Sequence, residues 1–262
     1  MKAPLELPEI RSVLEDDVLV IMLNRPEKSN SINGTLARGL YALVDWSEQA
    51  DEVRAVILHG AGSRVFCAGA DLAEIAHGKS ADQWVGDAGF AGFVRAERSK
   101  PWIAALNGSA YGGGTEIALA CDLIVAAEDA LMSLPEVTRG FIASAGGAFR
   151  LSRAMPPRLA LEAMLTGRSV GMEAAVRWGL VNRVCRADCV LKEARALARA
   201  ITVNAPLAVR ATLAIARRSV SPDEEKLWAF SDEARQSVLR SDDAKEGARA
   251  FLEKRPPVWR GR

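Results

Sequence analysis

Two glutamates of this 262-residue chain stand where they could perform acid/base chemistry. Glu116 lies in the first turn of an apolar helical segment, and Glu136 follows Leu134-Pro135. Two carboxylates around one water molecule form an acid/base pair, because their environments push the two pKa values apart. The residues are 20 positions apart, so only the fold can bring them together. Taken singly, each is more often a helix-dipole or salt-bridge residue, and Glu136 could simply pair with Arg139.

The segment that leads into Glu116 is rich in glycine. From Asn107 to Glu116 it reads NGSAYGGGTE. Three consecutive glycines at a helix start are costly in backbone entropy, but they leave bare N–H groups at the positive end of the helix dipole. Such donors stabilise a developing enolate oxygen. The spacing differs from that of phosphate-binding loops, since no Gly-Lys-Ser/Thr follows. A tight turn that needs room for packing explains the glycines as well.

A second turn, from Cys67 to Leu72, could bring another backbone amide to a ligand. Its sequence is CAGADL, and the glycine in it permits backbone geometry that a Cβ would forbid. Small residues at Ala68 and Ala70 let a ligand approach the main chain. Asp71 followed by Glu74 fits a capping box, with the aspartate as N-cap and the glutamate reaching back to it. A plain helix start is the alternative interpretation.

The pattern of elements around these turns indicates an α/β fold. Near-continuous apolar runs are expected of strands covered on both faces, and such runs occupy Val18–Leu23, Ala55–Leu58, Trp102–Leu106 and Leu123–Ala126. Between the first two, a helix carries Leu36, Leu40, Leu43 and Val44 on one face. The alternation of strands and helices is typical of the α/β class.

Beyond about residue 187 the strand signals stop and helical patterns continue. The last helix is predicted to begin at Ser241, with Asp242 and Asp243 in its first turn, where acids suit the helix dipole. Pro256-Pro257 ends it. The sequence therefore predicts an α/β body of about 190 residues and a helical tail.

Composition excludes several classes of function. The chain is 49% hydrophobic, an ordinary value for a globular protein. It has 34 basic and 33 acidic residues and a net charge of +1, so it offers no strong electrostatic field for nucleic acid or anionic lipid. The four cysteines follow no disulfide or zinc spacing. The first residues lack the apolar run of a signal peptide, and no stretch nears 18 apolar residues. We expect a cytoplasmic protein with reduced cysteines and no bound metal.

Taken together, the segments resemble the enoyl-CoA hydratase/isomerase (crotonase) family. The resemblance runs over nearly the whole chain and includes LNRPEK, FCAGADL, NGSAYGGGTE, LPEVTRG and the ending FLEKRPPVWRGR. The ending and the stretch Asp87–Phe93 are closest to the carnitinyl-CoA dehydratase-like branch. The resemblance implies a crotonase-like β-β-α spiral core over 1–190, which holds the coenzyme A and active sites. It also implies a C-terminal helical trimerisation region over 191–262, assembled as a homotrimer or as a hexamer built from two trimers.

The resemblance also assigns roles to individual residues. It implies an oxyanion hole at the N–H groups of Ala70 and Gly113, and an acid/base pair at Glu116 and Glu136. Coenzyme A is expected along Ala68, Ala70, Asp71 and Leu72, with Arg25, Lys28 and Arg64 as candidate cations for its phosphates. The implied reaction is reversible hydration of an enoyl-CoA thioester, a lyase reaction of the kind used in β-oxidation, in which coenzyme A is part of the substrate and no further cofactor is needed.

Other activities remain open at the level of sequence. An enoyl-CoA isomerase, a carnitinyl-CoA dehydratase-like enzyme or an acyl-CoA hydrolase could use the same carboxylates. Ser144 stands where dienoyl-CoA isomerases and aromatic dehalogenases of the family carry a catalytic aspartate, which disfavours both reactions. An RNA-binding relative is the alternative from a different class, and the near-neutral charge argues against it. The segment 77–98, with Trp84, Phe90 and Phe93, is expected to shape the acyl pocket or to be part of the core.

Overall fold

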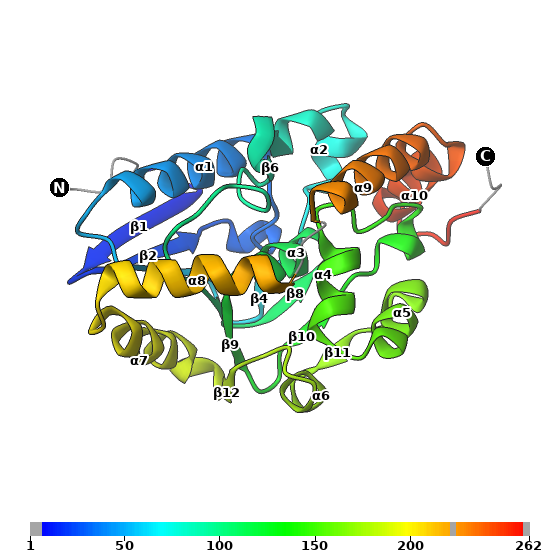
Figure 1. Ribbon diagram of the computed structural model, residues 1–262. Helices are drawn as coiled ribbons and strands as arrows, with labels where there is room; N and C mark the ends of the chain where they lie inside the picture. Colours follow the sequence, from blue (N-terminus) through cyan, green and yellow to red (C-terminus); the bar gives the residue numbers. More distant parts are fainter. Residues whose placement is uncertain (1–6, 221–223, 259–262) are drawn as a thin grey trace.

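The computed structural model describes residues 7–220 and 224–258, apart from the side chains of residues 218–220 and of part of the helix that follows (Figure 1). Two sheets carry the fold. The larger has six strands in the order β1-β2-β3-β7-β9-β12. These strands are β1 (Ile10–Glu15), β2 (Val18–Leu23), β3 (Ala55–Gly60), β7 (Trp102–Leu106), β9 (Leu123–Ala127) and β12 (Arg183–Cys185). From β2 to β12 every pairing is parallel, whereas β1 pairs with β2 antiparallel.

The four strands predicted from continuous apolar runs are β2, β3, β7 and β9, and the structure confirms them. Their residues are almost all buried, as strands covered on both faces require. The two edge strands, β1 and β12, were not predicted. Each leaves one side to solvent, with Val13 and Val184 exposed, so neither shows a continuous apolar run.

The smaller sheet has the order β11-β10-β8-β4. Its strands are only two or three residues long: β4 (Val65–Cys67), β8 (Ser109–Tyr111), β10 (Leu131–Ser133) and β11 (Val170–Gly171). Consecutive strands alternate between the sheets, because β3 leads to β4, β7 to β8 and β9 to β10. Each such pair is followed by a helical segment: α2 (Leu72–Ala76), α3 (Gly113–Ala120) and the 3-10 turn η4 (Glu136–Arg139). The chain therefore climbs one strand in both sheets with every turn of a spiral.

This spiral explains how distant segments reach one place. Strands β4, β8 and β10 are parallel neighbours, so the residues that follow them emerge at the same edge of the sheet. Those residues are 68–71, 112–116 and 134–136, the three segments in which the sequence placed its candidate chemistry.

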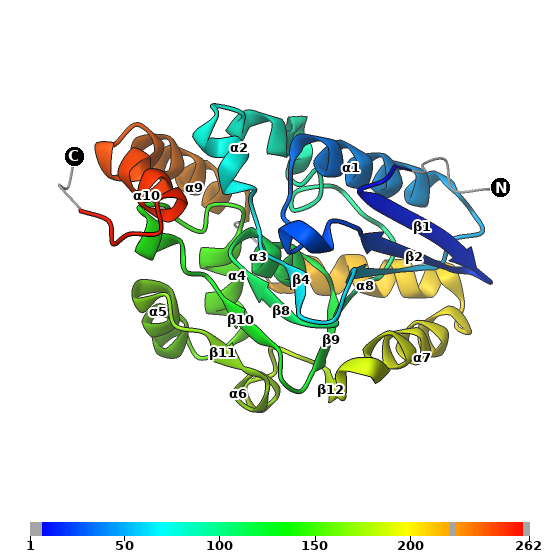
Figure 2. The same cartoon turned by 180° about the vertical axis from the view of Figure 1, so that it is seen from behind.

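The remaining helices surround the two sheets (Figures 1 and 2). They are α1 (Gly34–Gln49), α4 (Gly147–Ala154), α5 (Pro157–Thr166), α6 (Met172–Arg177), α7 (Val190–Thr202), α8 (Pro206–Val220), α9 (Glu224–Leu239) and α10 (Asp242–Leu252). The predicted apolar face of α1 is buried. Ser241 caps α10 as predicted, accepting a hydrogen bond from the amide of Ala244. No helix of the described residues has the length and apolar character that a bilayer crossing requires.

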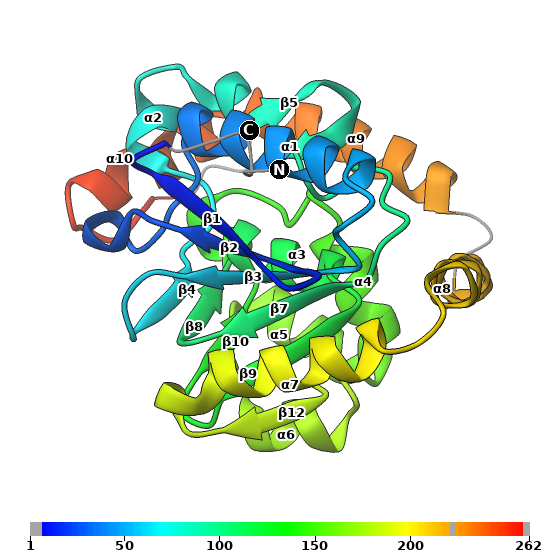
Figure 3. The ribbon, with the colours of Figure 1, turned by 90° about the vertical axis from the view of Figure 1, so that its left-hand side faces the viewer.

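The helices after β12 do not all lie on the body in the same way. Helix α7 packs on β3, β7 and β9, whereas α10 contacts α2 and η4. Figure 3 views α8 end-on beside the sheets, and its Leu207 and Ile215 are largely exposed. An ion pair from Arg217 to both carboxylate oxygens of Asp122, each at 2.8 Å, ties α8 to the body.

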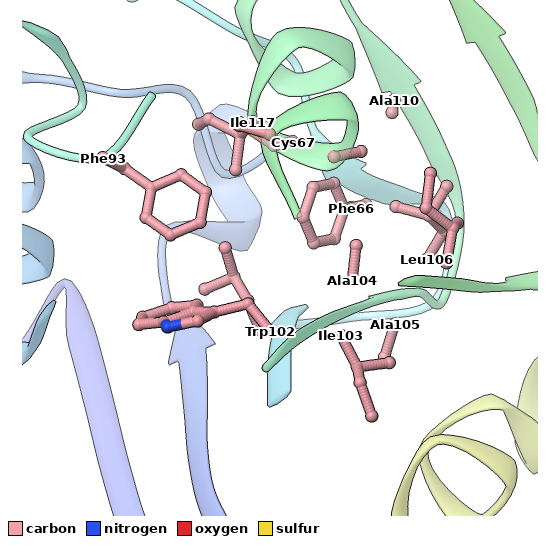
Figure 4. Close-up of a cluster of buried hydrophobic side chains, with 14 of the residues drawn as sticks. Phe66, Cys67, Phe93, Trp102, Ile103, Ala104, Ala105, Leu106, Ala110 and Ile117 are labelled. Carbon is pink, nitrogen blue, oxygen red and sulfur yellow. The ribbon is translucent and has the colours of Figure 1, made fainter. Parts of the chain in front are cut away.

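A fully buried apolar cluster holds the spiral together (Figure 4). Phe66 of β4, Trp102 of β7 and Ile117 of α3 meet there, and the Phe93 ring packs on Trp102 with 4.8 Å between centroids. Burying one phenylalanine side chain contributes about 1.5–3 kcal/mol to stability. Because β4 and α3 share this core, the turn that follows β4 and the turn that precedes α3 are both held on a rigid support.

Candidate active site

A cavity of about 540 Å³ lies at the edge where β4, β8 and β10 end. Of the residues proposed from sequence, Lys28, Ala68, Ala70, Asp71, Leu72, Gly113, Glu116 and Glu136 line it. Arg25 and Arg64 do not. The fold therefore brings the two glutamates and both candidate amides together from three segments that are well separated in sequence.

The turns after β4 and β8 approach each other so closely that only glycine fits between them. Gly69 adopts a positive φ of 85°, and a Cβ there would stand 2.6 Å from the amide nitrogen of Gly113. A Cβ at Gly114 would stand 2.1 Å from the carbonyl oxygen of Cys67. Two of the glycines singled out in the sequence are thus required by close backbone contact. The structure therefore confirms the packing explanation, and ligand approach stays a prediction.

Two backbone amides at this contact are without a hydrogen-bond acceptor among the described residues. The N–H groups of Ala70 and Gly113 donate no hydrogen bond within the described part of the chain. The backbone groups on either side of Ala70 are hydrogen-bonded. The amide of Asp71 donates to the carbonyl of Ile32, and the amide of Ile32 donates to the carbonyl of Gly69. Gly113 is the first residue of α3, where an amide has no partner inside its helix. These amides can therefore hold a ligand oxygen.

Glu116 points into the cavity from the first turn of α3, and it is only 4% exposed. The amide of Gly147 donates to its Oε1 at 2.9 Å. Burial raises the pKa of this carboxyl above its ordinary value, and the charge of Glu136 raises it further. Hydrogen bonds from the amides of Gly147 and Ala145 oppose the rise without cancelling it.

Glu136 begins η4 and is partly open to the cavity. Its Oε1 lies 3.3 Å from the place where a Cβ at Gly112 would stand, while its Oε2 is buried without a hydrogen-bond partner within the described residues. Burial raises the pKa of Glu136 as well, against lowering effects from its own amide and from the charge of Arg139. The predicted alternative, a direct ion pair between Glu136 and Arg139, is not formed.

Asp71 is the N-cap of α2, as predicted, and its side chain accepts hydrogen bonds from the amides of Ala73 and Glu74. The second half of the predicted capping box is wrong. The Glu74 carboxylate accepts from the amide of Gly34 at 3.3 Å instead, because the amide of Asp71 is already bonded to the carbonyl of Ile32.

Arg25 also differs from its predicted role. It is buried, and both terminal nitrogens of its guanidinium lie 3.1 Å from Oδ2 of Asp71. A guanidinium held in this way positions the turn of Ala70 and has no free side for a coenzyme phosphate. Lys28, by contrast, is exposed and lines the cavity, close to Ala68 through the hydrogen bond from the Ala68 amide to the carbonyl of Ser29.

Helices α9 and α10 form part of the cavity wall, although the predicted domain division assigned the active site to residues 1–190. Among the described residues, these helices contribute Arg235, Leu239, Phe251 and Leu252. Sequence gave no signal for Arg235, which stands in a helix without a motif. Trp84 and Phe90 line the cavity as expected, whereas Phe93 belongs to the core. Tyr111 also lines it and was missed, although it directly precedes the glycine turn.

The arrangement combines two functions in one cavity. Two free amides can polarise a carbonyl oxygen and stabilise negative charge that develops on it. Two neighbouring carboxyls with raised pKa values can exchange protons with a water molecule and a carbon atom near that carbonyl. Among the described residues no cluster of three or more histidine, cysteine, aspartate or glutamate side chains could hold a metal ion.

Comparison with known proteins gives a consistent result. The family model described as enoyl-CoA hydratase/isomerase matches residues 14–262. A carnitinyl-CoA dehydratase from Citrobacter koseri is 41% identical over 250 residues, which covers 94% of this chain and 95% of that protein. The crystal structure of a carnitinyl-CoA hydratase from Mycobacterium avium superposes with a TM-score of 0.92 at 41% identity, over 98% of this chain and all of the other. An enoyl-CoA hydratase from Mycobacterium tuberculosis gives a TM-score of 0.79 at 41% identity, with the same coverage.

Proposed function

The chain belongs to the enoyl-CoA hydratase/isomerase family and has the crotonase fold, and from this premise we propose that it is an enoyl-CoA hydratase. The proposed reaction adds water reversibly across the 2,3 double bond of an enoyl-CoA thioester. The observation that carries the proposal is the presence of two carboxyls with raised pKa values on the cavity that also holds two free amides.

The proposed mechanism starts at the thioester carbonyl, whose oxygen accepts hydrogen bonds from Ala70 and Gly113. Polarisation of this carbonyl makes the β-carbon electrophilic and stabilises the enolate that forms after attack. In the form of the pair whose shared proton lies on Glu136, ionised Glu116 orients a water molecule and takes its proton as the oxygen bonds to the β-carbon. Protonated Glu136 then delivers its proton to the α-carbon. Hydroxyl and hydrogen have been added, and the proton has moved from one glutamate to the other.

Raised pKa values suit this exchange, because the pair must hold one proton at neutral pH. Burial and mutual repulsion both disfavour the doubly ionised state. The structure thus supports a pair in which one carboxyl is base and the other acid. In the reverse direction the same pair removes water from a 3-hydroxyacyl thioester.

The substrate's coenzyme is proposed to run past Ala68, Asp71 and Leu72, with Lys28 near its phosphates. The steps above need only the substrate, a water molecule and protein groups, so we propose that no metal or redox cofactor takes part. We also propose a cytoplasmic homotrimer, alone or paired into a hexamer. The exposed apolar residues of α8 support self-association, since an apolar helix face is normally covered.

A carnitinyl-CoA dehydratase-like activity is the second candidate, since relatives of 40–41% identity carry that name. The decisive experiment is a substrate panel for the purified protein. Hydration of crotonyl-CoA and crotonobetainyl-CoA is followed by loss of the conjugated enoyl absorbance, and product identity is checked by mass spectrometry. Gain of 18 mass units supports hydration. Conversion of a 3-enoyl-CoA without mass change, or release of free thiol, would instead identify an isomerase or a hydrolase.

A further inference from the structure

One wall of the cavity runs from the amide of Gly113 to a positive charge on α9. The Phe90 ring lies beside Gly113, because its Cε1 and Cζ atoms are 2.5 and 2.7 Å from where a Cβ at Gly113 would stand. The Trp84 ring meets Phe90 edge-on, with 5.8 Å between centroids. The guanidinium of Arg235 lies over Trp84, 4.1 Å from the ring centre. All four residues line the cavity.

Among the described residues no carboxylate forms an ion pair with Arg235. Asp232, an acid whose charge acts on Arg235, is bonded to Arg95 at 2.6 Å. Within the described residues Arg235 makes no hydrogen bond or ion pair, and its interactions are the stacking on Trp84 and the fields of Asp232 and Arg95. Burial lowers the pKa of Arg235, yet a guanidinium stays protonated in proteins. A partly buried cation on a cavity wall gains most from an anionic ligand.

The other cations of the cavity lie on different segments. Lys28 adjoins Ala68 through Ser29, and Arg139 follows Glu136 and lies 5.4 Å from the centre of the Phe251 ring. Two aromatic rings, those of Phe90 and Trp84, lead from the oxyanion amide to Arg235. A ligand that follows this wall therefore needs an apolar chain next to its carbonyl and a negative charge at its far end.

We propose that Arg235 selects acyl groups that end in a carboxylate. This inference rests on the proposed function, because it takes the wall beside Gly113 as the acyl side of the site. A carboxylate can accept two parallel hydrogen bonds from the guanidinium, while the methylene chain covers the rings.

The same arrangement disfavours acyl groups that end in a quaternary ammonium. Such a cation binds best over an aromatic face, but the face of Trp84 already carries the guanidinium of Arg235. The ligand charge would have to approach a like charge, and repulsion of this kind is an effective source of specificity. The chain would then differ in substrate preference from relatives named as carnitinyl-CoA dehydratases.

The test compares three enoyl thioesters: 2-hexenedioyl-CoA with a terminal carboxylate, neutral 2-hexenoyl-CoA, and crotonobetainyl-CoA. We expect kcat/KM for the carboxylate to exceed that for the neutral substrate by about tenfold to a hundredfold, the worth of a charge-assisted hydrogen bond. Arg235→Gln should abolish the preference for the carboxylate over the neutral substrate, and Arg235→Lys should keep part of it. Arg235→Glu should give a higher kcat/KM for the ammonium substrate than for the carboxylate. Arg240→Gln, which removes an exposed charge just beyond the same helix, is the matched control and should leave the ratio unchanged.

Two further outcomes would overturn the proposal. If Arg235→Gln kept the same ratio of kcat/KM between the carboxylate and the neutral substrate, the guanidinium would not bind the end of the acyl group. An equal loss for all substrates and for free coenzyme A as an inhibitor would assign Arg235 to a coenzyme phosphate. Calorimetry with the unreactive adipoyl-CoA and hexanoyl-CoA measures the same preference without turnover. A protein that hydrates none of the thioesters yet binds adipoyl-CoA more tightly would contradict the hydratase proposal and retain the acyl preference.

Discussion

Replacing Glu116 with glutamine should lower activity and raise stability in the same protein. Glutamine keeps an oxygen that can accept the hydrogen bond from Gly147 and carries no charge. As the group that takes the proton from water is removed, we expect hydration turnover to fall by about 10²–10⁴. Binding of a saturated acyl-CoA should change little, because the amides of Ala70 and Gly113 remain.

The gain in stability follows from the direction of the pKa shift. Burial and the charge of Glu136 raise the pKa of Glu116 from 4.5 to about 8. A raised pKa means that the folded state binds the proton more tightly, so this residue becomes progressively more unfavourable for folding as the pH rises above 4.5. The penalty grows by about 1.4 kcal/mol per pH unit and reaches at most about 3 kcal/mol at pH 7. Glu116→Gln should therefore be more stable than wild type by about 1–3 kcal/mol at pH 7, with most of the gain gone at pH 4.5.

Urea unfolding at pH 4.5, 6 and 7.5, at one fixed protein concentration, measures this difference, and crotonyl-CoA hydration measures the activity. Glu97→Gln, which neutralises an exposed carboxylate outside the cavity, is the matched control and should show neither effect. A stability difference that is the same at every pH would refute the argument from buried charge. Full turnover in Glu116→Gln would refute its role as base.

Three further predictions follow from the same geometry. Glu136→Gln should also lower hydration turnover by about 10²–10⁴, measured in the same crotonyl-CoA assay. Loss of activity in this variant alone, with full activity in Glu116→Gln, would indicate an isomerase. Gly69→Ala should lower both kcat and the unfolding midpoint, measured by kinetics and urea titration, because a Cβ at φ 85° would meet the Gly113 amide nitrogen at 2.6 Å and costs more than about 1 kcal/mol. Removal of residues 222–262 should leave an aggregation-prone chain that is not a stable trimer, and a truncated chain that stays trimeric and active in light scattering would contradict this.

Sequence predicted those parts of the fold in which one element carries its own signal. Strands β2, β3, β7 and β9 are buried on both faces, so each appears as a continuous apolar run. Strands β4, β8, β10 and β11 have two or three residues, too few for any periodicity to be read. The alternation between two sheets depends on these short strands, and the spiral was accordingly expected only from the family resemblance.

The site was predictable at its backbone and less so at its side chains. The glycines at Gly69 and Gly113 indicated close approach of main chains, and the structure has that contact. The partner of Arg25 lies 46 residues away, and no local pattern indicates that its guanidinium binds Asp71. Arg235 reaches the cavity only because α9 folds back over the body, which no local pattern records.

The buried carboxyl pair lowers the folding stability of the protein, and the packing around the pair keeps both groups buried. Glu116 is buried beside another acid, which costs free energy at neutral pH, yet its turn follows β8 and its helix is anchored by Ile117 in the fully buried cluster. That rigid support prevents relaxation that would let water solvate the charge. The same exclusion of water strengthens the hydrogen bonds that Ala70 and Gly113 can give to a developing enolate. Loosening the support, as in Gly69→Ala, should therefore weaken the oxyanion site and return the pKa of Glu116 toward 4.5 together, rather than one without the other.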